Sequence, residues 1–448
     1  MAKDKNTRMR ALGDFVERLD RFAYPRILLA VCSLCLSFTV FFIAPKTVKS
    51  TVNIDYEPQI RNLIAGQGFL DDDGRVMDRY PPVYPLLLAS IRVGSASTGA
   101  PYSLSLFLVA ATFIAISCLL VYDIARLVLC GPGAVGAALL FTAHPHVLYG
   151  TLKPLSETPF IVIFLAAVCC LLFTLVRKPR LSAVGMFLAG VFAGFAILIR
   201  PAALLVPIVM VIAVLVIGTA RRTVRVRQAA VLLLGSLLAL LPWEVFMWQR
   251  SGHIVLVSSA GVPALRDGFT FNKKGWRSHI WLPEGVRWVS DQVWSSYPHL
   301  NSVSDIASLL GEKARRRPLA VVETYLFKAG RSWYGTDSQN SRLELVNALL
   351  VLVFGVPAGV GIWRYMRSGS RRDRGGGLLL LGLTVYFWGM TTIVLSIARY
   401  MAPAIGLLSP FIPLALGDGI CGRESMETLN KDHKAERQQR AVTPVGGN

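Results

Sequence analysis

Residues 27–44 read ILLAVCSLCLSFTVFFIA, an apolar run without a charged side chain. The hydrocarbon core of a bilayer takes about 20 helical residues to cross, so this run predicts a transmembrane helix. Residues 1–26, which precede it, carry seven basic and four acidic side chains, and no small-x-small cleavage site follows the run. Because a cleaved signal peptide would show such a site, we interpret the helix as a retained signal anchor.

Similar apolar runs recur along the whole chain. Apolar residues make up 53% of the sequence and charged residues 17%, whereas soluble domains have about 45–50% and about 25%. We therefore predict an all-α polytopic membrane protein, a helical bundle of about 10 transmembrane helices. The predicted spans are 27–44, 104–122, 132–149, 159–176, 183–199, 201–218, 229–247, 345–363, 378–396 and 402–417.

The distribution of charge predicts how the chain is oriented. Its net charge is +20, and its basic residues gather in short connections such as 177–180, 221–227 and 364–374. Short basic loops face the cytoplasm, so both termini are expected there. Since the basic clusters lie beside apolar runs, they argue against nucleic-acid binding. The seven cysteines all lie outside the predicted exoplasmic loops, which argues against a disulfide framework.

This orientation divides the chain into three parts. A cytoplasmic segment (1–26) precedes a transmembrane domain (27–417), and a polar, disordered cytoplasmic tail (418–448) follows. Two exoplasmic connections are long: the first loop, 45–103, and the large loop, 248–344. In the large loop, three consecutive arginines precede an apolar stretch, 319–327, which is suited to a helix at the membrane interface.

The first loop holds acidic residues close to the end of the first helix. It contains VNIDYEPQIRNLIAGQGFLDDDGRVMDRYPPVYPLLLAS (52–90), in which Asp55 and Glu57 come first. Apolar residues then recur at helical spacing up to Ile64, and Gly66 follows, so we expect a short surface helix. The apolar residues 82–93 are too few to span and predict an interfacial helix. A carboxylate fixed here could act as a general base, although a solvated loop acid fits the same pattern.

Five motifs, in order, resemble those of GT-C glycosyltransferases that use polyprenyl-phosphate sugars. That superfamily includes the protein O-mannosyltransferases, the lipid A aminoarabinose transferases and the bacterial lipopolysaccharide-core glycosyltransferases. The first motif is the first loop, which contains Asp55-Tyr56, Gly66-x-Gly68-Phe69 and Pro81-Pro82-Val83-Tyr84-Pro85. The other four are Ser156-Glu157, Arg200-Pro201, the segment LPWEVFMWQRSG (241–252) and the segment ARYMAP (398–403). The resemblance covers about 50–415. One departure is Val52, where many members carry the acidic residue.

The resemblance implies a GT-C-like fold and an inverting transfer to a hydroxyl of a glycan, lipid or protein acceptor, which we expect at a bacterial inner membrane. The implied base is Asp55, with Glu57 as the alternative because of the departure at Val52. Arginines or lysines near the membrane surface would hold the donor phosphate. The candidates are first Arg200 and Arg399, then Arg61, Arg79, Lys153 and Lys328; Glu157, Tyr56 and Tyr84 are candidates for substrate binding.

No metal site is predicted, although the resemblance leaves a divalent cation open as a cofactor. His144 and His146 flank a proline near Glu157, but an interfacial histidine pair explains them as well. The run Asp71-Asp72-Asp73-Gly74 looks like a DxD motif, yet an acidic run that ends in glycine is more typical of a turn.

Two other classes of protein fit the composition. A transporter or lipid flippase would need ionisable residues inside its spans, and the predicted spans are almost bare of them. A non-catalytic envelope scaffold would not need charged groups gathered in one place. The predicted topology instead brings Asp55, Glu157, Arg200 and Arg399 to one membrane surface.

Overall fold

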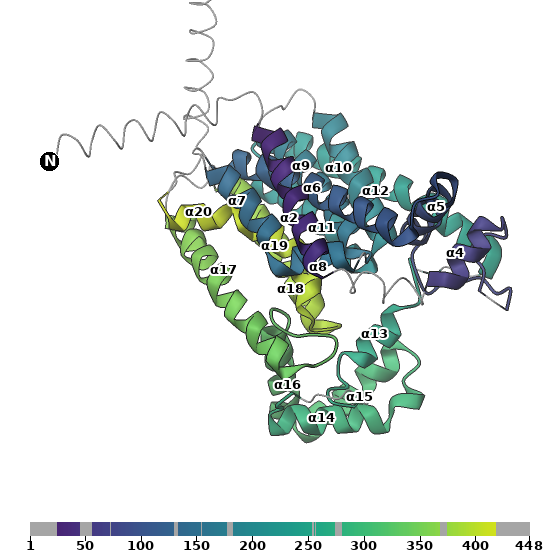
Figure 1. Ribbon diagram of the computed structural model, residues 1–448. Coiled ribbons are helices and arrows are strands. Elements are labelled where there is room, and N and C mark those ends of the chain that lie inside the picture. Colours follow the sequence, from purple (N-terminus) through teal and green to yellow (C-terminus); the bar gives the residue numbers. More distant parts are fainter. Residues whose placement is uncertain are drawn as a thin grey trace, which may run out of the picture.

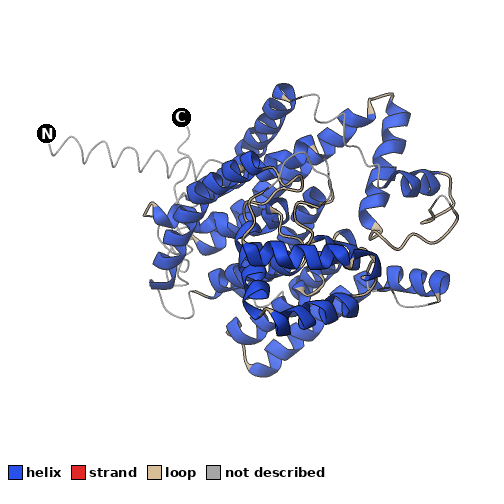
Figure 2. Ribbon diagram, turned by 90° about the horizontal axis from the view of Figure 1, so that it is seen from below, coloured by secondary structure: helices blue, strands red, loops and turns tan. Residues whose placement is uncertain are grey.

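The computed structural model describes residues 25–44, 56–71, 73–129, 133–153, 155–176, 182–252, 255, 257–273, 280–367 and 374–417. Within these ranges the regular elements are helices, apart from one antiparallel bridge between Leu70 and Val76. Figure 1 shows a helical bundle with a smaller group of helices, α13–α16 (residues 261–331), at one end of it, and Figure 2 shows that the described elements are helices. The all-α fold class is therefore confirmed. The expected cytoplasmic tail, 418–448, lies outside the described residues.

In the part of the chain that the structure describes, six helices are long and apolar enough to cross a membrane. They are α2 (Pro25–Ile43), α6 (Tyr102–Val128), α9 (Glu157–Val176), α12 (Arg222–Ser251), α17 (Ser341–Arg367) and α18 (Gly375–Ile393). Three shorter apolar helices, α7 (Gly133–Ala143), α10 (Ser182–Ile199) and α11 (Val206–Ile217), pack among them. The chain is thus a membrane protein, and the full set of ten crossings remains a prediction.

Prolines divide the span that we expected at 402–417. The chain there forms α19 (Ala402–Leu408), η6 (Ser409–Phe411) and α20 (Ile412–Ala415) instead of one α-helix, and the 3₁₀ helix η5 (Ala398–Met401) precedes them. Proline has no N–H to donate, and its ring disfavours a continuous helix. Proline also divides the expected span 132–149, because α7 ends at Ala143 and α8 (Pro145–Leu152) begins two residues later.

Small residues let α10 and α12 approach closely. A Cβ atom on Gly190 would stand 2.0 Å from the carbonyl oxygen of Leu232, and one on Gly235 would stand 2.4 Å from that of Phe187. The Ser236 hydroxyl donates a hydrogen bond of 2.9 Å to the Gly190 carbonyl. In lipid, where water does not drive helices together, such close backbone contact and interhelical hydrogen bonds hold a bundle. Helix α10 also packs on α9, so α9, α10 and α12 are packed together through α10.

The first loop folds as its pattern predicted. Helix α4 (Glu57–Ile64) ends before Gly66 and Gly68, whose φ angles of 75° and 85° are left-handed and so favour glycine. The expected interfacial helix at 82–93 is α5 (Val83–Thr98), which packs against α4. Asn62 secures the following turn, since its amide donates to the carbonyls of Leu70 and Asp71.

The described residues of the large loop include four α-helices around an apolar core of their own. They are α13 (Gly261–Asp267), α14 (Glu284–Ser295), α15 (Val303–Arg316) and α16 (Pro318–Arg331). The core consists of Phe269, Val289, Val293, Leu300, Ile306 and Ala320. We call residues 261–331, which hold these four helices, the α13–α16 subdomain. It lies below the bundle in Figure 1.

A buried ion pair fixes the junction between this subdomain and the bundle. Arg331, at the end of α16, lies 2.5 Å from Glu344 in α17, and these side chains are only 3% and 7% exposed. Arg331 also donates to the carbonyl of Ser396, and the Thr336 N–H donates to Glu344. The segment between α16 and α17 is therefore held against the turn that leads into η5.

Candidate active site

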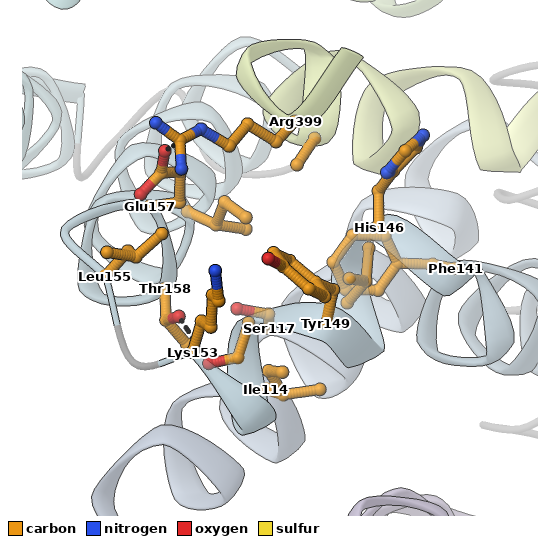
Figure 3. A pocket seen from close by; sticks show the side chains of 14 residues that line it. Ile114, Ser117, Phe141, His146, Tyr149, Lys153, Leu155, Glu157, Thr158 and Arg399 are labelled. Carbon is orange, nitrogen blue, oxygen red and sulfur yellow. Dashed lines mark hydrogen bonds and ion pairs between the residues drawn. The ribbon is translucent and has the colours of Figure 1, made fainter. Parts of the chain in front are cut away.

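Glu157 lies at the centre of a charged cluster formed by three separate elements. Its carboxylate is 2.6 Å from Arg200 and 3.4 Å from Nε of Arg399. The side chains of Glu157 and Arg200 are 13% and 15% exposed, and that of Arg399 is 26% exposed. Figure 3 shows the guanidinium of Arg399 directly over the Glu157 carboxylate. Of the four residues expected at one membrane surface, Glu157, Arg200 and Arg399 lie together in the structure, and Asp55 lies outside the described residues.

Local structure at helix ends places each of these side chains. Glu157 is the first residue of α9, where the helix dipole favours a negative charge. Arg200 follows the last residue of α10 in an extended conformation, and Pro201 comes next. A residue before proline is disfavoured in the α conformation, so the helix ends there. Arg399 lies in the short 3₁₀ helix η5. The cluster thus lies at one end of the bundle.

Tyr400 supports both arginines from one side. Its ring centroid is 4.6 Å from Cζ of Arg200 and 5.1 Å from Cζ of Arg399. Arg399 also donates a hydrogen bond of 3.3 Å to the Tyr400 hydroxyl. Stacking on an aromatic face holds a guanidinium in a fixed plane and leaves its edge for hydrogen bonds.

Asp337 is a fourth charged member, which the sequence did not reveal. Its carboxylate lies 3.0 Å from Nη1 of Arg399, and its side chain is 45% exposed. Burial raises the pKa of Asp337, while Arg399 acts in the opposite direction. No motif marks Asp337 within the large loop. It reaches the cluster because the Arg331–Glu344 pair holds its segment, and because the Ala398 N–H donates to the Gly335 carbonyl.

The first loop contributes aromatic residues beside the cluster. Tyr56 packs with its ring centroid 4.4 Å from Tyr80 and 5.1 Å from Tyr84. Burial raises the pKa of Tyr56, and the charges of Arg200 and Glu157 act on its hydroxyl. Tyr56 is therefore close to the cluster, as is the buried Tyr84. Asp55, the residue before Tyr56 and our leading candidate base, lies outside the described residues.

Glu57, the alternative base, is engaged elsewhere. Its two carboxylate oxygens accept hydrogen bonds of 2.5 and 2.9 Å from the guanidinium of Arg92. That contact lowers the pKa of Glu57, and it joins α4 to α5. A carboxylate with both oxygens held by arginine is a weak proton acceptor. The geometry therefore favours a structural role for Glu57.

The other candidate cations differ in position. Lys153 lines a small cleft together with Glu157, Arg399 and Tyr149. In Figure 3 the Lys153 amine and the Tyr149 hydroxyl point into this space. Among the described residues, the cluster and cleft combine three cations with the two carboxylates of Glu157 and Asp337. The resulting excess of one positive charge suits a singly charged phosphodiester.

Three candidates lie outside this cleft. Lys328 is completely buried, and its ammonium donates to the carbonyls of Ile393 and Val394 at the end of α18. Lys328 therefore caps a helix, and we leave it out of the proposed donor site. Arg79 stacks on Tyr80 at 5.3 Å and is exposed. Arg61 is exposed on α4, near Glu57.

The two sequence patterns that resembled metal sites form other structures. One carboxylate oxygen of Asp71 accepts hydrogen bonds from the N–H groups of Asp73 and Arg75, which is an Asx turn. His144 packs on Phe354, with 4.6 Å between ring centroids, and lies beside His146. In the described part of the chain, no group of three or more His, Cys, Asp or Glu residues could hold a metal ion.

Comparison with known proteins identifies the fold. Residues 80–248 match the family model for dolichyl-phosphate-mannose-protein mannosyltransferase. The archaeal oligosaccharyltransferase AglB from Archaeoglobus fulgidus, solved with an inhibitory peptide and a dolichol-phosphate, superimposes with a TM-score of 0.54 at 15% identity, over 95% of this chain and 52% of that one. ArnT from Cupriavidus metallidurans, bound to undecaprenyl phosphate, superimposes with a TM-score of 0.51 at 16% identity, over 87% of this chain and 59% of that one.

These matches show that the chain has the GT-C fold, as its sequence motifs predicted. No curated protein matches the sequence. The chain spans only about half to three fifths of the length of the two solved structures. Its own activity, donor and acceptor are therefore matters of proposal.

Proposed function

We propose that this chain is an inverting glycosyltransferase. It would move a sugar from a polyprenyl-phosphate donor to a hydroxyl of a lipid, glycan or protein on the exoplasmic face of the membrane. The observation that carries the proposal is the cluster of Glu157, Arg200 and Arg399 beside Tyr56. The GT-C fold supports it, as do the dolichol-phosphate and undecaprenyl phosphate bound to AglB and ArnT.

The residues of the cluster suit a single displacement step. Arg200, Arg399 and Lys153 would bind the donor phosphate, and Glu157 would keep the two arginines in place. The acceptor oxygen attacks the anomeric carbon while the bond from that carbon to the phosphate oxygen breaks. The phosphate leaves with the electron pair and the added negative charge, which the cations stabilise. The hydroxyl proton passes to a base, for which Asp55 is our candidate.

The position of the charges favours catalysis over transport. Glu157, Arg200 and Arg399 all lie at the ends of helical elements, whereas a transport path would need ionisable groups within the spans. We place the protein in a bacterial inner membrane, with its termini in the cytoplasm and the cluster on the opposite face. The short basic connections support this orientation.

Two variants of neighbouring acids test the proposal. Asp55→Asn should lower transfer from a polyprenyl-phosphate sugar by about 10²–10⁴-fold, the usual contribution of a general base. Its matched control, Glu57→Gln, should keep most of the activity, because Arg92 already holds that carboxylate. Both proteins should accumulate in the membrane. The opposite ranking would move the base to Glu57, and normal transfer by both variants would refute an acid from this loop as the base.

A further inference from the structure

One face of α16 exposes a stripe of apolar side chains. Leu319, Val322 and Leu326 are 82%, 53% and 69% exposed, and their spacing of three and four residues places them on one side of the helix. The opposite face is buried, with Ala320, Thr324, Lys328 and Arg331. We call Leu319, Val322 and Leu326 the α16 stripe. Exposed apolar residues that line up in this way usually mark a contact surface.

The α16 stripe is close to a membrane-spanning helix. The indole N–H of Trp388, in α18, donates a hydrogen bond of 2.8 Å to the carbonyl of Ala329 near the end of α16. Trp388 precedes the last residue of α18 by five positions, which is about 7.5 Å along a helix. The carboxyl end of α16 therefore lies beside the last turns of α18 rather than above them.

The exposed surface of α18 is apolar, like the α16 stripe. Val385 and Ile393 are 62% and 50% exposed on this membrane-spanning helix. Trp388 lies between them in sequence and is 39% exposed. Tryptophan gathers at the boundary between lipid and water, where its ring is buried and its N–H finds a partner. Figure 1 shows α16 at the foot of α17, at the end of the bundle.

Basic residues lie at the other end of the stripe. Arg315, Arg316 and Arg317 are exposed where α15 passes into α16. Arg316 is 2.8 Å from Glu312, and Arg317 is 3.8 Å from Glu284, so these two charges are partly compensated. Long basic side chains beside an apolar surface extend their charged ends toward lipid phosphates and water.

We propose that the α16 stripe rests on the phospholipid bilayer, with its three leucine and valine side chains among the acyl chains and Arg315–Arg317 at the headgroup phosphates. The α13–α16 subdomain would then be a peripheral membrane element as well as a loop between spans. This contact would hold the end of α16, and with it the Arg331–Glu344 pair, at a fixed height above the membrane. The inference does not depend on the proposed enzymatic activity.

Photocrosslinking of the full chain in lipid vesicles tests this contact. A benzophenone amino acid would replace Val322 or Leu326 in protein reconstituted into phosphatidylcholine and phosphatidylglycerol. The matched control would replace Ser308, an exposed polar residue on the neighbouring α15. We expect phospholipid adducts, detected by mass spectrometry, from positions 322 and 326 and none from position 308. Because all three side chains are exposed, none of the substitutions disturbs a buried core.

Two results would overturn the proposal. Crosslinks from positions 322 and 326 to a second protein chain, without lipid adducts, would show that another protein covers the stripe. The absence of lipid adducts at both positions, as at 308, would show that the stripe faces water. A further variant, Arg315→Gln with Arg316→Gln and Arg317→Gln, tests the headgroup contact. Because Arg316 and Arg317 already have acidic partners, we expect an effect of about one basic residue near an anionic surface, which is an approximately fivefold lower yield of phosphatidylglycerol adducts. An unchanged yield would overturn the headgroup contact.

Discussion

Glu157→Gln should show whether the two arginines form an anion site. The glutamine has nearly the same shape but no charge, so Arg200 loses its carboxylate while Arg399 keeps Asp337. Removing one partner of a buried ion pair costs about 3–5 kcal/mol. Because Arg399 keeps a partner, we expect about 3 kcal/mol, which is on the order of a hundredfold in the unfolding equilibrium.

A lipid phosphate should reverse this loss. Undecaprenyl phosphate would place a negative charge where the carboxylate was, and a ligand at 100 times its Kd stabilises a protein by about 2.7 kcal/mol. The assay is thermal unfolding of the purified protein in detergent, with and without undecaprenyl phosphate. The lipid should raise the unfolding midpoint of Glu157→Gln more than that of the wild type.

Glu344→Gln provides a matched control. Its carboxylate also pairs with a buried arginine, Arg331, so it should be destabilised by a similar amount. Backbone groups fill the surroundings of that pair, so undecaprenyl phosphate should not rescue it. Equal rescue of both variants, or no loss of stability in Glu157→Gln, would refute the reasoning that Glu157 balances the charge of two arginines that bind a phosphate.

Three further predictions follow from single contacts. Asp337→Asn removes a half-exposed competitor for Arg399, so the donor KM should fall by roughly 2–5-fold; a rise would show that Asp337 assists donor binding. Arg399→Lys loses the planar guanidinium and its paired N–H groups, so steady-state kinetics should show a KM for the sugar donor that is roughly tenfold higher. An unchanged KM would remove Arg399 from the site that binds the sugar donor. Arg92 lowers the pKa of Glu57 in the folded protein. The Arg92–Glu57 pair therefore stabilises the fold at pH values above the ordinary glutamate pKa of about 4.3, and this stabilisation is lost as the pH falls through the lowered pKa of Glu57. Glu57→Gln should therefore be less stable than the wild type at pH 7 by under about 1 kcal/mol, and the two unfolding midpoints should converge in acid; a constant difference at all pH values would contradict this.

The sequence predicted the elements whose ends depend on residues close by in the chain. Helix α4 follows from apolar spacing and two glycines, and the ends of α9 and α10 follow from a charged residue at the boundary of an apolar run. Glu157 and Arg200 could be placed at the same membrane surface in advance, because consecutive helices in a bundle bring alternate connections to the same face, but their ion pair became visible only in the structure. Arg399 joined them through the same topological argument.

Other features depend on contacts between distant segments, which no local pattern reveals. Asp337 reaches Arg399 because Arg331, Glu344 and Ser396 hold two loops together. The role of Lys328 as a helix cap became visible only once α16 was seen against the end of α18. The division of the last expected span was open to prediction from its prolines, but average hydropathy over a window gave them too little weight.

A structure of the full chain with undecaprenyl phosphate bound would test the central claim most directly. The proposed function predicts that the phosphate lies between Arg200 and Arg399, with at least one phosphate oxygen about 3 Å from a guanidinium nitrogen. It also predicts that the carboxylate of Asp55 lies on the acceptor side of the site, across the sugar position from the phosphate, where it can reach the attacking hydroxyl. A phosphate bound at the opposite end of the bundle, or one that contacts neither arginine, would contradict the proposal that this cluster is a glycosyltransferase active site.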